Sequence, residues 1–354
     1  MTTRPADAPT VVLCGLATLD LVQTVERLPA PDEKVVAQEL HVAAGGPATN
    51  AAVTAAALGV RAVLVTRVGD GPLADAVLAD LAQHEVEVRD LARPGWAPAV
   101  STVLVTAGTG ERAVVSVNAT GSREAGGDDG ATVAGPQARR GALDLVDVLD
   151  VLEGAAVLLV DGHHLDLAVP MAREARRVGV PVLLDGGSWK PGLEQLLELV
   201  DVAVVSADLR VPADLRVSAR VMPADPAAPD APRLSTLSRL AALGPAVVAC
   251  SRGGDPMTVL TIRPMRAQGV VVVPSVKVVD TLGAGDVLHG ALAAWWALHP
   301  GTTAASGLPV WEEALSAAAA VASSSCTGAG ARGWLADAGR LAEARADVRP
   351  QPSR

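Results

Sequence analysis

Short apolar runs that end in glycine or a polar residue recur along this chain and predict buried strands. They lie at residues 11–15, 61–69, 155–161, 181–185, 202–206 and 246–250. A strand that is apolar along its whole length is typical of a parallel sheet with helices on both faces. Segments rich in Ala and Leu, at 51–59, 72–85 and 311–325, predict helices between or after these strands. The alternation predicts an α/β fold with a mostly parallel sheet.

Two stretches interrupt this alternation. Residues 34–43 alternate imperfectly between apolar and polar side chains, which predicts an antiparallel strand with one exposed face. Residues 99–107 and 112–118 predict a hairpin across the turn at 108–111. We therefore expect a small β-sheet lid with strands from about 34–44 and 97–118. Residues 121–141 are rich in Gly, Ala, Asp and Arg without periodicity, and predict a mobile insertion.

The candidate chemistry is concentrated in residues 270–290. A β-branched run ends at Asp280, small residues follow at 283–285, and an Ala/Leu-rich run begins, which predicts strand, tight loop and helix. Amides at such a helix N-terminus can cradle a phosphate. Asp286 would repel that phosphate, so it is a candidate general base that accepts the proton of an attacking hydroxyl. The alternative is an ordinary turn in which Asp286 only favours the helix N-terminus.

A second set of polar candidates lies near the N-terminus. Asp20 follows the first predicted strand, and a carboxylate there can accept hydrogen bonds from two hydroxyl groups. Gly45 and Gly46 precede an Ala-rich helix in which Asn50 offers both a donor and an acceptor. A turn-capping role for Asp20 and an ordinary glycine turn are the alternatives.

Composition narrows the classes of partner. The formal net charge is −10, and the 29 basic residues form no stripe with interleaved aromatics, which argues against a nucleic-acid partner. An anionic nucleotide would have to be held by local backbone donors and a metal. Phe and Tyr are absent, so any base stacking must use Trp or an aliphatic floor. Three widely spaced Cys predict reduced core residues, and the lack of a signal core or a membrane-length apolar run predicts a cytoplasmic protein without a membrane partner.

The motifs together resemble a known family. Residues 280–291, Asp-Thr-Leu-Gly-Ala-Gly-Asp-Val-Leu-His-Gly-Ala, resemble the C-terminal signature of the PfkB (ribokinase-like) family of carbohydrate kinases. The spacing of the N-terminal signature is matched by Gly45, Gly46, Asn50, Gly59 and Gly69. Two departures are Leu288, where Phe is usual, and Pro47, where relatives often have Gly, Asn or Lys. The resemblance implies a three-layer α/β/α ribokinase-like domain over 11–333 with a small β-sheet lid, and a C-terminal helix and tail over 334–354.

The resemblance also implies a role for each matching residue. Asp286 would be the catalytic base, with the anion hole formed by Gly283, Ala284 and Gly285. The sugar would be bound by Asp20, Gly45, Gly46, Asn50 and, near the lid tip, Asn118. ATP would contact Ser206, Asp208, Ser251, Arg252, Gly253 and Thr281. Relatives commonly have Asn-x-x-Glu at 206–209, where this chain has Ser-Ala-Asp-Leu. Asp208 could then hold Mg²⁺ through water, and Asp280 a monovalent cation such as K⁺.

The predicted function is ATP-dependent phosphorylation of a sugar-type hydroxyl by direct in-line transfer. One alternative is a nucleoside or sugar-phosphate kinase, for which Lys190 and Arg112 are the candidate cations. Another is a nucleotide-binding regulator without turnover, which the altered 206–209 motif favours and Asp286 opposes. A match to GxGxxG at 328–333 follows a helix instead of a strand, so it does not support a dinucleotide enzyme. Exposed lid edges predict a possible homodimer.

Paired histidines remain to be explained. His163 and His164 follow a predicted strand, but no further His, Cys or carboxylate stands at a familiar ligand spacing. The pair is therefore expected to pack or to contact the sugar, with a metal site as the alternative.

Overall fold

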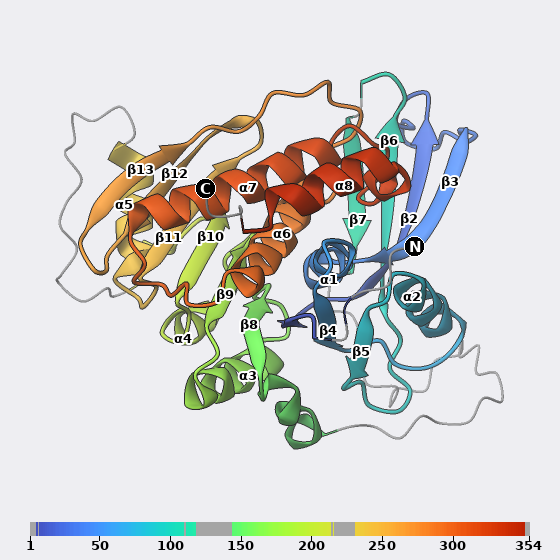
Figure 1. The fold of residues 1–354 in the computed structure, drawn as a ribbon. Helices are drawn as coiled ribbons and strands as arrows, with labels where there is room; N and C mark the ends of the chain where they lie inside the picture. The colour runs from blue at the N-terminus through green and yellow to red at the C-terminus, as the bar shows by residue number, and fades with distance from the viewer. Residues whose placement is uncertain are drawn as a thin grey trace.

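A nine-stranded sheet lies between two layers of helices, and a smaller four-stranded sheet stands beside it (Figure 1). This computed structural model describes residues 5, 7–109, 111–117, 144–213, 215 and 231–350. The strand order in the large sheet is β13-β12-β11-β10-β9-β8-β1-β4-β5. The predicted three-layer α/β/α fold with a β lid is confirmed.

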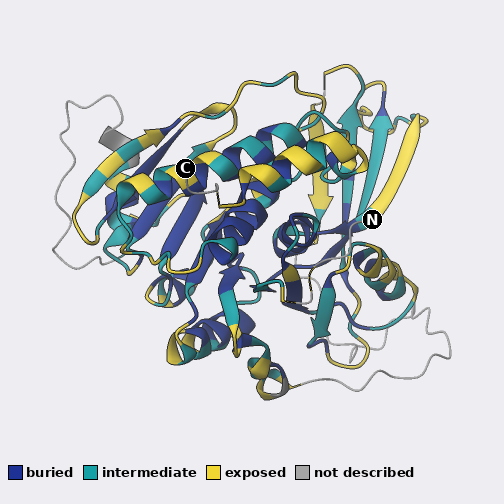
Figure 2. Ribbon diagram, in the orientation of Figure 1, coloured by how far each residue is buried: buried dark blue, intermediate teal, exposed yellow. Residues whose placement is uncertain are grey.

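The large sheet is parallel from β5 through to β11 and antiparallel at its other edge. Its parallel strands are β1 (Thr10–Cys14), β4 (Arg61–Thr66), β5 (Glu87–Asp90), β8 (Ala155–Val160), β9 (Val182–Gly186), β10 (Val202–Ser206) and β11 (Val247–Arg252). The antiparallel edge consists of β12 (Asp255–Thr261) and β13 (Ala267–Val271). The central strands are buried on both faces, which is why they read as continuous apolar runs (Figure 2).

The helices form two separate apolar layers, one on each face of the sheet. One layer contains α1 (Pro47–Ala57), α2 (Pro72–Gln83), α6 (Ala284–Leu298), α7 (Leu308–Ser325) and α8 (Ala338–Asp347). The other contains α3 (Leu165–Val178), α4 (Leu193–Leu197) and α5 (Ala231–Ala241), with a 3₁₀ segment at Leu145–Leu152. A second 3₁₀ segment, Gly333–Ala336, precedes α8. No helix in the described ranges combines the length and apolarity that a membrane span needs.

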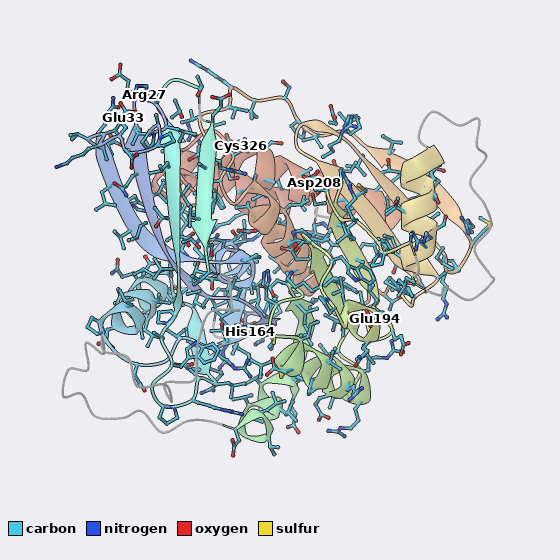
Figure 3. The ribbon with its side chains drawn as sticks, turned by 180° about the vertical axis from the view of Figure 1, so that it is seen from behind. Arg27, Glu33, His164, Glu194, Asp208 and Cys326 are labelled. Carbon is cyan, nitrogen blue, oxygen red and sulfur yellow. The ribbon has the colours of Figure 1, made fainter. Side chains whose placement is uncertain are left out.

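The lid sheet has the strand order β3-β2-β6-β7. Its strands are β2 (Thr18–Val25), β3 (Glu39–Gly45), β6 (Ala99–Thr106) and β7 (Arg112–Ser116). The β6–β7 hairpin forms where the sequence predicted it. Two features differ from the sequence prediction: β3 begins at Glu39 instead of residue 34, and residues 18–25, for which no strand was predicted, form a central strand of the lid. Figure 3 shows Arg27 and Glu33 together at the free end of this sheet.

The segment before the small-residue loop also differs from its prediction. The strand expected over residues 270–279 ends at Val271, and residues 272–280 run outside the sheet. Pro274 cannot donate to a ladder, and Val272 is 72% exposed, so this segment has left the core. Residues 118 and 121–141 lie outside the described part of the chain.

Candidate active site

Helices α1 and α6 bring the two distant motifs together. Gly290 of α6 lies so close to α1 that a Cβ atom built on it would be 2.4 Å from the carbonyl oxygen of Ala51. This close approach places Asn50 beside the first turn of α6, where its Nδ2 donates to Asp286 Oδ2 at 2.8 Å. Two side chains 236 positions apart in the chain are therefore in direct contact.

The carboxyl group of Asp286 is held in an environment that disfavours its charge. Burial is the main cause, and the nearby carboxylates of Asp185 and Asp161 add to it. The hydrogen bond from Asn50 and the proximity of His289 oppose the effect, and the resulting pKa is about 7 against an ordinary value of 3.8. A carboxylate with such a pKa binds protons well at neutral pH, as a general base must.

The amides of the first turn of α6 form a donor array at the mouth of a cleft. Gly283 is the N-cap residue with φ 73°, and Ala284 N donates to Thr281 O at 3.3 Å. The first intrahelical hydrogen bond runs from Val287 N to Gly283 O at 2.8 Å. The amides of Gly285 and Asp286 precede Val287, so they have no carbonyl acceptor within the helix and lie at the positive end of its dipole. Ala284, Gly285 and Asp286 all line the cleft. The turn can therefore bind an anion beside a base.

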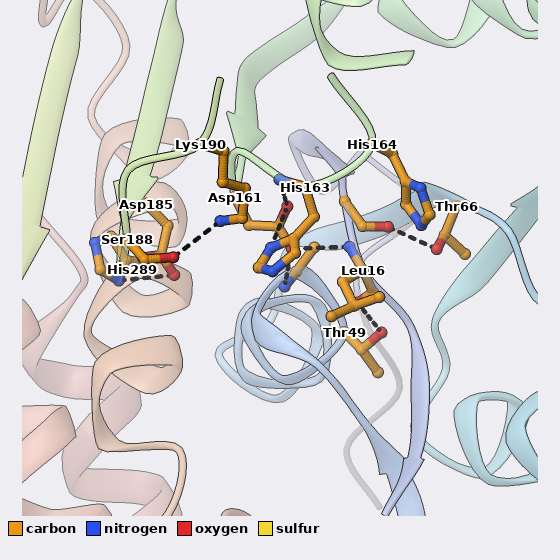
Figure 4. A network of polar contacts seen from close by, with 12 residues as sticks. Leu16, Thr49, Thr66, Asp161, His163, His164, Asp185, Ser188, Lys190 and His289 are labelled. Atoms are coloured by element: carbon orange, nitrogen blue, oxygen red, sulfur yellow. Dashed lines mark hydrogen bonds and ion pairs between the residues drawn. The ribbon is translucent and has the colours of Figure 1, made fainter. Parts of the chain in front are cut away.

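Asp161, at the end of β8, connects three segments around this site (Figure 4). Its Oδ2 accepts from Leu16 N at 2.8 Å and from Ala48 N at 3.1 Å, and its Oδ1 accepts from His163 N at 2.8 Å. Burial alone would raise the pKa of Asp161, but His163 and the backbone amides of Leu16 and His163 lower it to about 2. A permanently ionised carboxylate thus fixes the loop after β1 against the start of α1.

Arg332 fixes the orientation of the Asn50 amide. Its buried guanidinium contacts Asp80 and the carbonyl of Ala44, and its Nη2 donates to Asn50 Oδ1 at 3.4 Å. Since the Asn50 oxygen accepts from Arg332, the amide nitrogen is the group that faces Asp286. Arg332 lies within the GxGxxG match at 328–333, but that local pattern does not indicate this contact with Asn50.

Asp20 lies on the lid face that carries a row of hydroxyl groups. Strand register places it opposite Ser101, and Ser101 opposite Ser116, on the same face of the sheet. Thr18 Oγ1 donates to Asp20 Oδ1 at 2.6 Å, and Ser101 Oγ donates to Ser116 Oγ at 3.0 Å. Burial raises the pKa of Asp20, and the hydrogen bond from Thr18 opposes this. Gly45 packs directly against this carboxyl group, and Gly46 is the N-cap of α1.

On the other side of Asp286 lies a cleft of about 1070 Å³. Every residue predicted to contact ATP lines it, namely Ser206, Asp208, Ser251, Arg252, Gly253 and Thr281. Arg252 is exposed at the rim, where it pairs with Asp255. Apolar side chains, including Leu209, Leu237 and Met257, line other parts of the wall. The cleft therefore offers an aliphatic surface next to polar groups.

The two predicted metal ligands have different surroundings. Asp280 is occupied on both oxygens, since Oδ1 accepts from Leu282 N at 2.9 Å and Oδ2 from Gly330 N at 2.8 Å. It therefore joins the anion-hole loop to the segment after α7. Asp208 lines the cleft, and its own amide donates to Ser206 Oγ at 3.1 Å. Within the described ranges no three His, Cys, Asp or Glu residues are clustered as a metal site.

The paired histidines have separate partners. His163 Nδ1 lies 3.4 Å from Asp161 Oδ1, so this residue belongs to the Asp161 network. His164 is the N-cap of α3, lies 3.4 Å from Arg67, and has its pKa lowered to about 4, mainly by burial. Asn118, predicted near the lid tip, lies outside the described residues.

Comparisons with known proteins agree on one family. Residues 8–337 match the family model described as pfkB family carbohydrate kinase. The chain is 26% identical to the ribokinase of Arabidopsis thaliana over 296 residues, which cover 81% of this chain and 70% of that protein. The structure of that ribokinase in complex with ribose and ATP superposes with a TM-score of 0.67 at 22% identity, over 96% of this chain and 99% of the other. Phosphofructokinase-2 from Escherichia coli in complex with potassium superposes with a TM-score of 0.66 at 18% identity, with the same coverage.

Proposed function

The chain belongs to the pfkB family of carbohydrate kinases, enzymes that phosphorylate a sugar-type hydroxyl with ATP, and from this premise we propose that Asp286 is its general base. The observation that carries the assignment is the contact between Asn50 and Asp286, with the first-turn amides of α6 beside them. A base with a pKa of about 7 stands where the cleft for the nucleotide meets the lid side of the site.

The reaction then follows from these positions. Asp286 takes the proton of the acceptor hydroxyl while that oxygen forms a bond to the γ-phosphorus, and the bond to the β,γ-bridging oxygen breaks to release ADP. The amides of Gly285 and Asp286 donate hydrogen bonds to the oxygens of the transferring phosphoryl group, on which negative charge develops in the transition state. Asn50 holds the carboxylate in place, and Arg332 holds Asn50.

The acceptor side is the lid face around Asp20. We propose that Asp20 accepts hydrogen bonds from sugar hydroxyls, with Ser101 and Ser116 as further polar groups on the same face. Gly45, Gly46 and Asn50 form the floor where β3 meets α1. Ser101 and Ser116 are additions to the set that sequence analysis named.

The nucleotide side is the cleft lined by Ser206, Asp208 and the β11–β12 turn. Mg²⁺ would neutralise the phosphates of ATP. Asp208 fits a contact through water, because it is a carboxylate in the cleft wall and Mg²⁺ keeps several waters when bound. K⁺ at Asp280 stays a prediction, since the observed contacts of that carboxylate are to backbone amides.

The other partner and location assignments also stay predictions. The outer face of the lid carries exposed apolar side chains at Leu40, Val42 and Val115, and a second copy of this chain is the proposed partner. The mass of the particle in solution tests this. A cytoplasmic location is proposed because the reaction consumes ATP.

The test is an assay of phosphorylated product across a panel of sugars, sugar phosphates and nucleosides. We expect the wild-type protein to phosphorylate at least one sugar, and Asp286→Asn to bind ATP but lose about 10²- to 10⁴-fold in kcat. Asp32→Asn makes the same exchange in an exposed turn between β2 and β3 and serves as the control. Unchanged turnover in Asp286→Asn would remove Asp286 from the mechanism. ATP binding without any product in the panel would favour a regulator.

A further inference from the structure

A buried histidine lies directly behind the anion hole. His289 is 3% exposed and follows Gly285 by one turn of α6. Its Nδ1 lies 2.7 Å from the carbonyl oxygen of Gly285 and 3.2 Å from Asp185 Oδ2. Its Nε2 lies 3.0 Å from the carbonyl oxygen of Val204. Figure 4 shows the ring and the Asp185 carboxylate facing each other.

The partners of this ring limit its protonation state. A neutral imidazole has one N–H donor and one nitrogen that can only accept. Two backbone carbonyl oxygens face opposite nitrogens of His289, and a carbonyl oxygen can only accept a hydrogen bond. Both ring nitrogens must therefore carry a proton if both contacts are hydrogen bonds. The nearby Asp185 carboxylate supplies the compensating negative charge that a buried cation requires.

We propose that His289 is a buried imidazolium, paired with Asp185, that serves as a positioning residue for the anion hole. It rests on the proposed function, because the anion hole has its role only in phosphoryl transfer. The pair connects the first turn of α6 to the ends of β9 and β10, and thereby fixes the direction of the amides that face the cleft.

The contact also acts through the peptide bond. The Gly285 carbonyl and the Asp286 N–H belong to one peptide group. A charged donor on that carbonyl polarises the group, so the N–H on its other side becomes a stronger donor to an anion. His289 therefore strengthens an anion-hole amide without touching the phosphate.

Several charged groups from different elements face Asp286 or the pair. Asp286 is affected by Asp185 from β9, by Asp161 from the end of β8 and by His289 on its own helix, and it accepts from Asn50 of α1. Asp185 is further affected by His163 and by Lys190. Within this group Asp185 raises the pKa of Asp286 and His289 lowers it.

The first experiment observes the ring itself. Histidine labelled with ¹⁵N is introduced into the whole protein, and the ring signals of His289 are assigned by their loss in His289→Gln. We expect two protonated ring nitrogens at pH 7.5 in the wild type, and a neutral ring in Asp185→Asn. A neutral ring in the wild type, as when the proton resides on Asp185, overturns the proposal. This measurement needs no turnover, so its failure is distinct from failure of the kinase mechanism.

The second experiment is a cycle of pH profiles. His289→Gln removes the cation and leaves Asp185 charged, so the apparent pKa of the acid limb of kcat/KM should rise and kcat should fall by about tenfold or more. The double variant with Asp185→Asn removes both charges and should return that pKa toward the wild-type value. If His289 serves packing alone, His289→Gln should lower activity and leave the apparent pKa of the acid limb at its wild-type value. That result overturns the proposal.

His299 provides the matched control. It lies on the same helix and makes the same contact, with Nδ1 2.7 Å from the carbonyl oxygen of Trp295 four residues earlier. It stands at the C-terminal end of α6, away from the anion hole. His299→Gln should leave the pH profile at its wild-type position. An equal shift in this variant would show that the effect arises from helix stability.

Discussion

At the scale of single residues, one environment gives Asp286 both a functional benefit and a cost in stability. The burial that raises its pKa suits it to act as a base, and the same burial destabilises the fold when the carboxyl group is charged. Its pKa is raised by burial and by neighbouring carboxylates, so the folded protein holds a proton there more tightly than the unfolded chain does. Stability from this group is complete below the unfolded pKa and is lost as pH rises through the folded pKa. The base is thus charged, and ready to accept a proton, only where its charge destabilises the fold.

This balance predicts that Asp286→Asn stabilises the protein while it removes activity. The variant and the wild type should unfold alike near pH 4, and their difference should widen until about pH 7 and stay constant above it. We expect a gain on the order of 1–3 kcal/mol at pH 8, after allowance for solvent in the cleft. Chemical denaturation between pH 4 and pH 8 measures it. A gain that does not depend on pH, or a loss at pH 8, contradicts it.

The site residues that could be predicted from the sequence differ in one property from those that could not. Asp286 and Asn50 stand in short motifs, so their neighbours in the chain identify them. Asp161 acts through amides of residues 145 and 113 positions away, and Arg332 through a side chain 282 positions away. Such roles depend on which strand ends and loops meet, and no local pattern encodes that.

At the scale of elements, the start of α6 has two glycines that differ in their surroundings. Gly283 needs its left-handed φ of 73°, and a Cβ atom there would lie 2.6 Å from the Cβ of Ala331. A Cβ atom on Gly285 would have no heavy atom within 4 Å. One glycine is required by the fold, and the other keeps open the space in front of the amides.

These surroundings predict different results for two alanine substitutions. Gly283→Ala should lower the free energy of unfolding by about 1–3 kcal/mol, through the positive φ and the contact with Ala331. Gly285→Ala should unfold at the wild-type temperature or slightly above it. Its methyl group should nevertheless raise the Kd for ATP about tenfold or more. Thermal unfolding and calorimetric titration with ATP test both. Normal ATP binding by Gly285→Ala would contradict the anion hole at this turn.

The elements that sequence analysis misjudged lie where the chain changes sheets. No strand was predicted for residues 18–25, yet the alternation of polar and apolar residues there suits a lid strand with one polar face. Residues 272–279 are rich in valine and were assigned to a strand, but they leave β13 and line the cleft. Propensity favoured extended backbone in both cases, and only tertiary contacts decide whether a partner strand is present.

At the scale of the whole molecule, the lid and the large sheet meet across the site. The sequence predicted the layers and the lid, because buried parallel strands and half-exposed antiparallel strands have different patterns. It did not predict the antiparallel edge of the large sheet or the four-strand order of the lid, which depend on pairing between distant segments. One of the contacts between the lid and the rest of the molecule lies at the anion-hole loop, where Arg112 Nη1 of β7 donates to Thr281 Oγ1 at 3.3 Å.

This contact predicts that Arg112 couples closure of the lid to productive transfer. A lid that closes poorly admits water, which competes with the sugar hydroxyl for the γ-phosphate. Arg112→Met should therefore lower the rate of sugar phosphorylation several-fold and raise the ratio of ADP released to phosphorylated sugar formed above one. Parallel assays of both products measure the ratio. Arg27→Met removes an exposed lid arginine that pairs only with Glu33 among the ion pairs of the described residues, and should keep a ratio of one. If Arg112→Met turns over more slowly but with every ADP matched by a phosphorylated sugar, Arg112 binds substrate without excluding water.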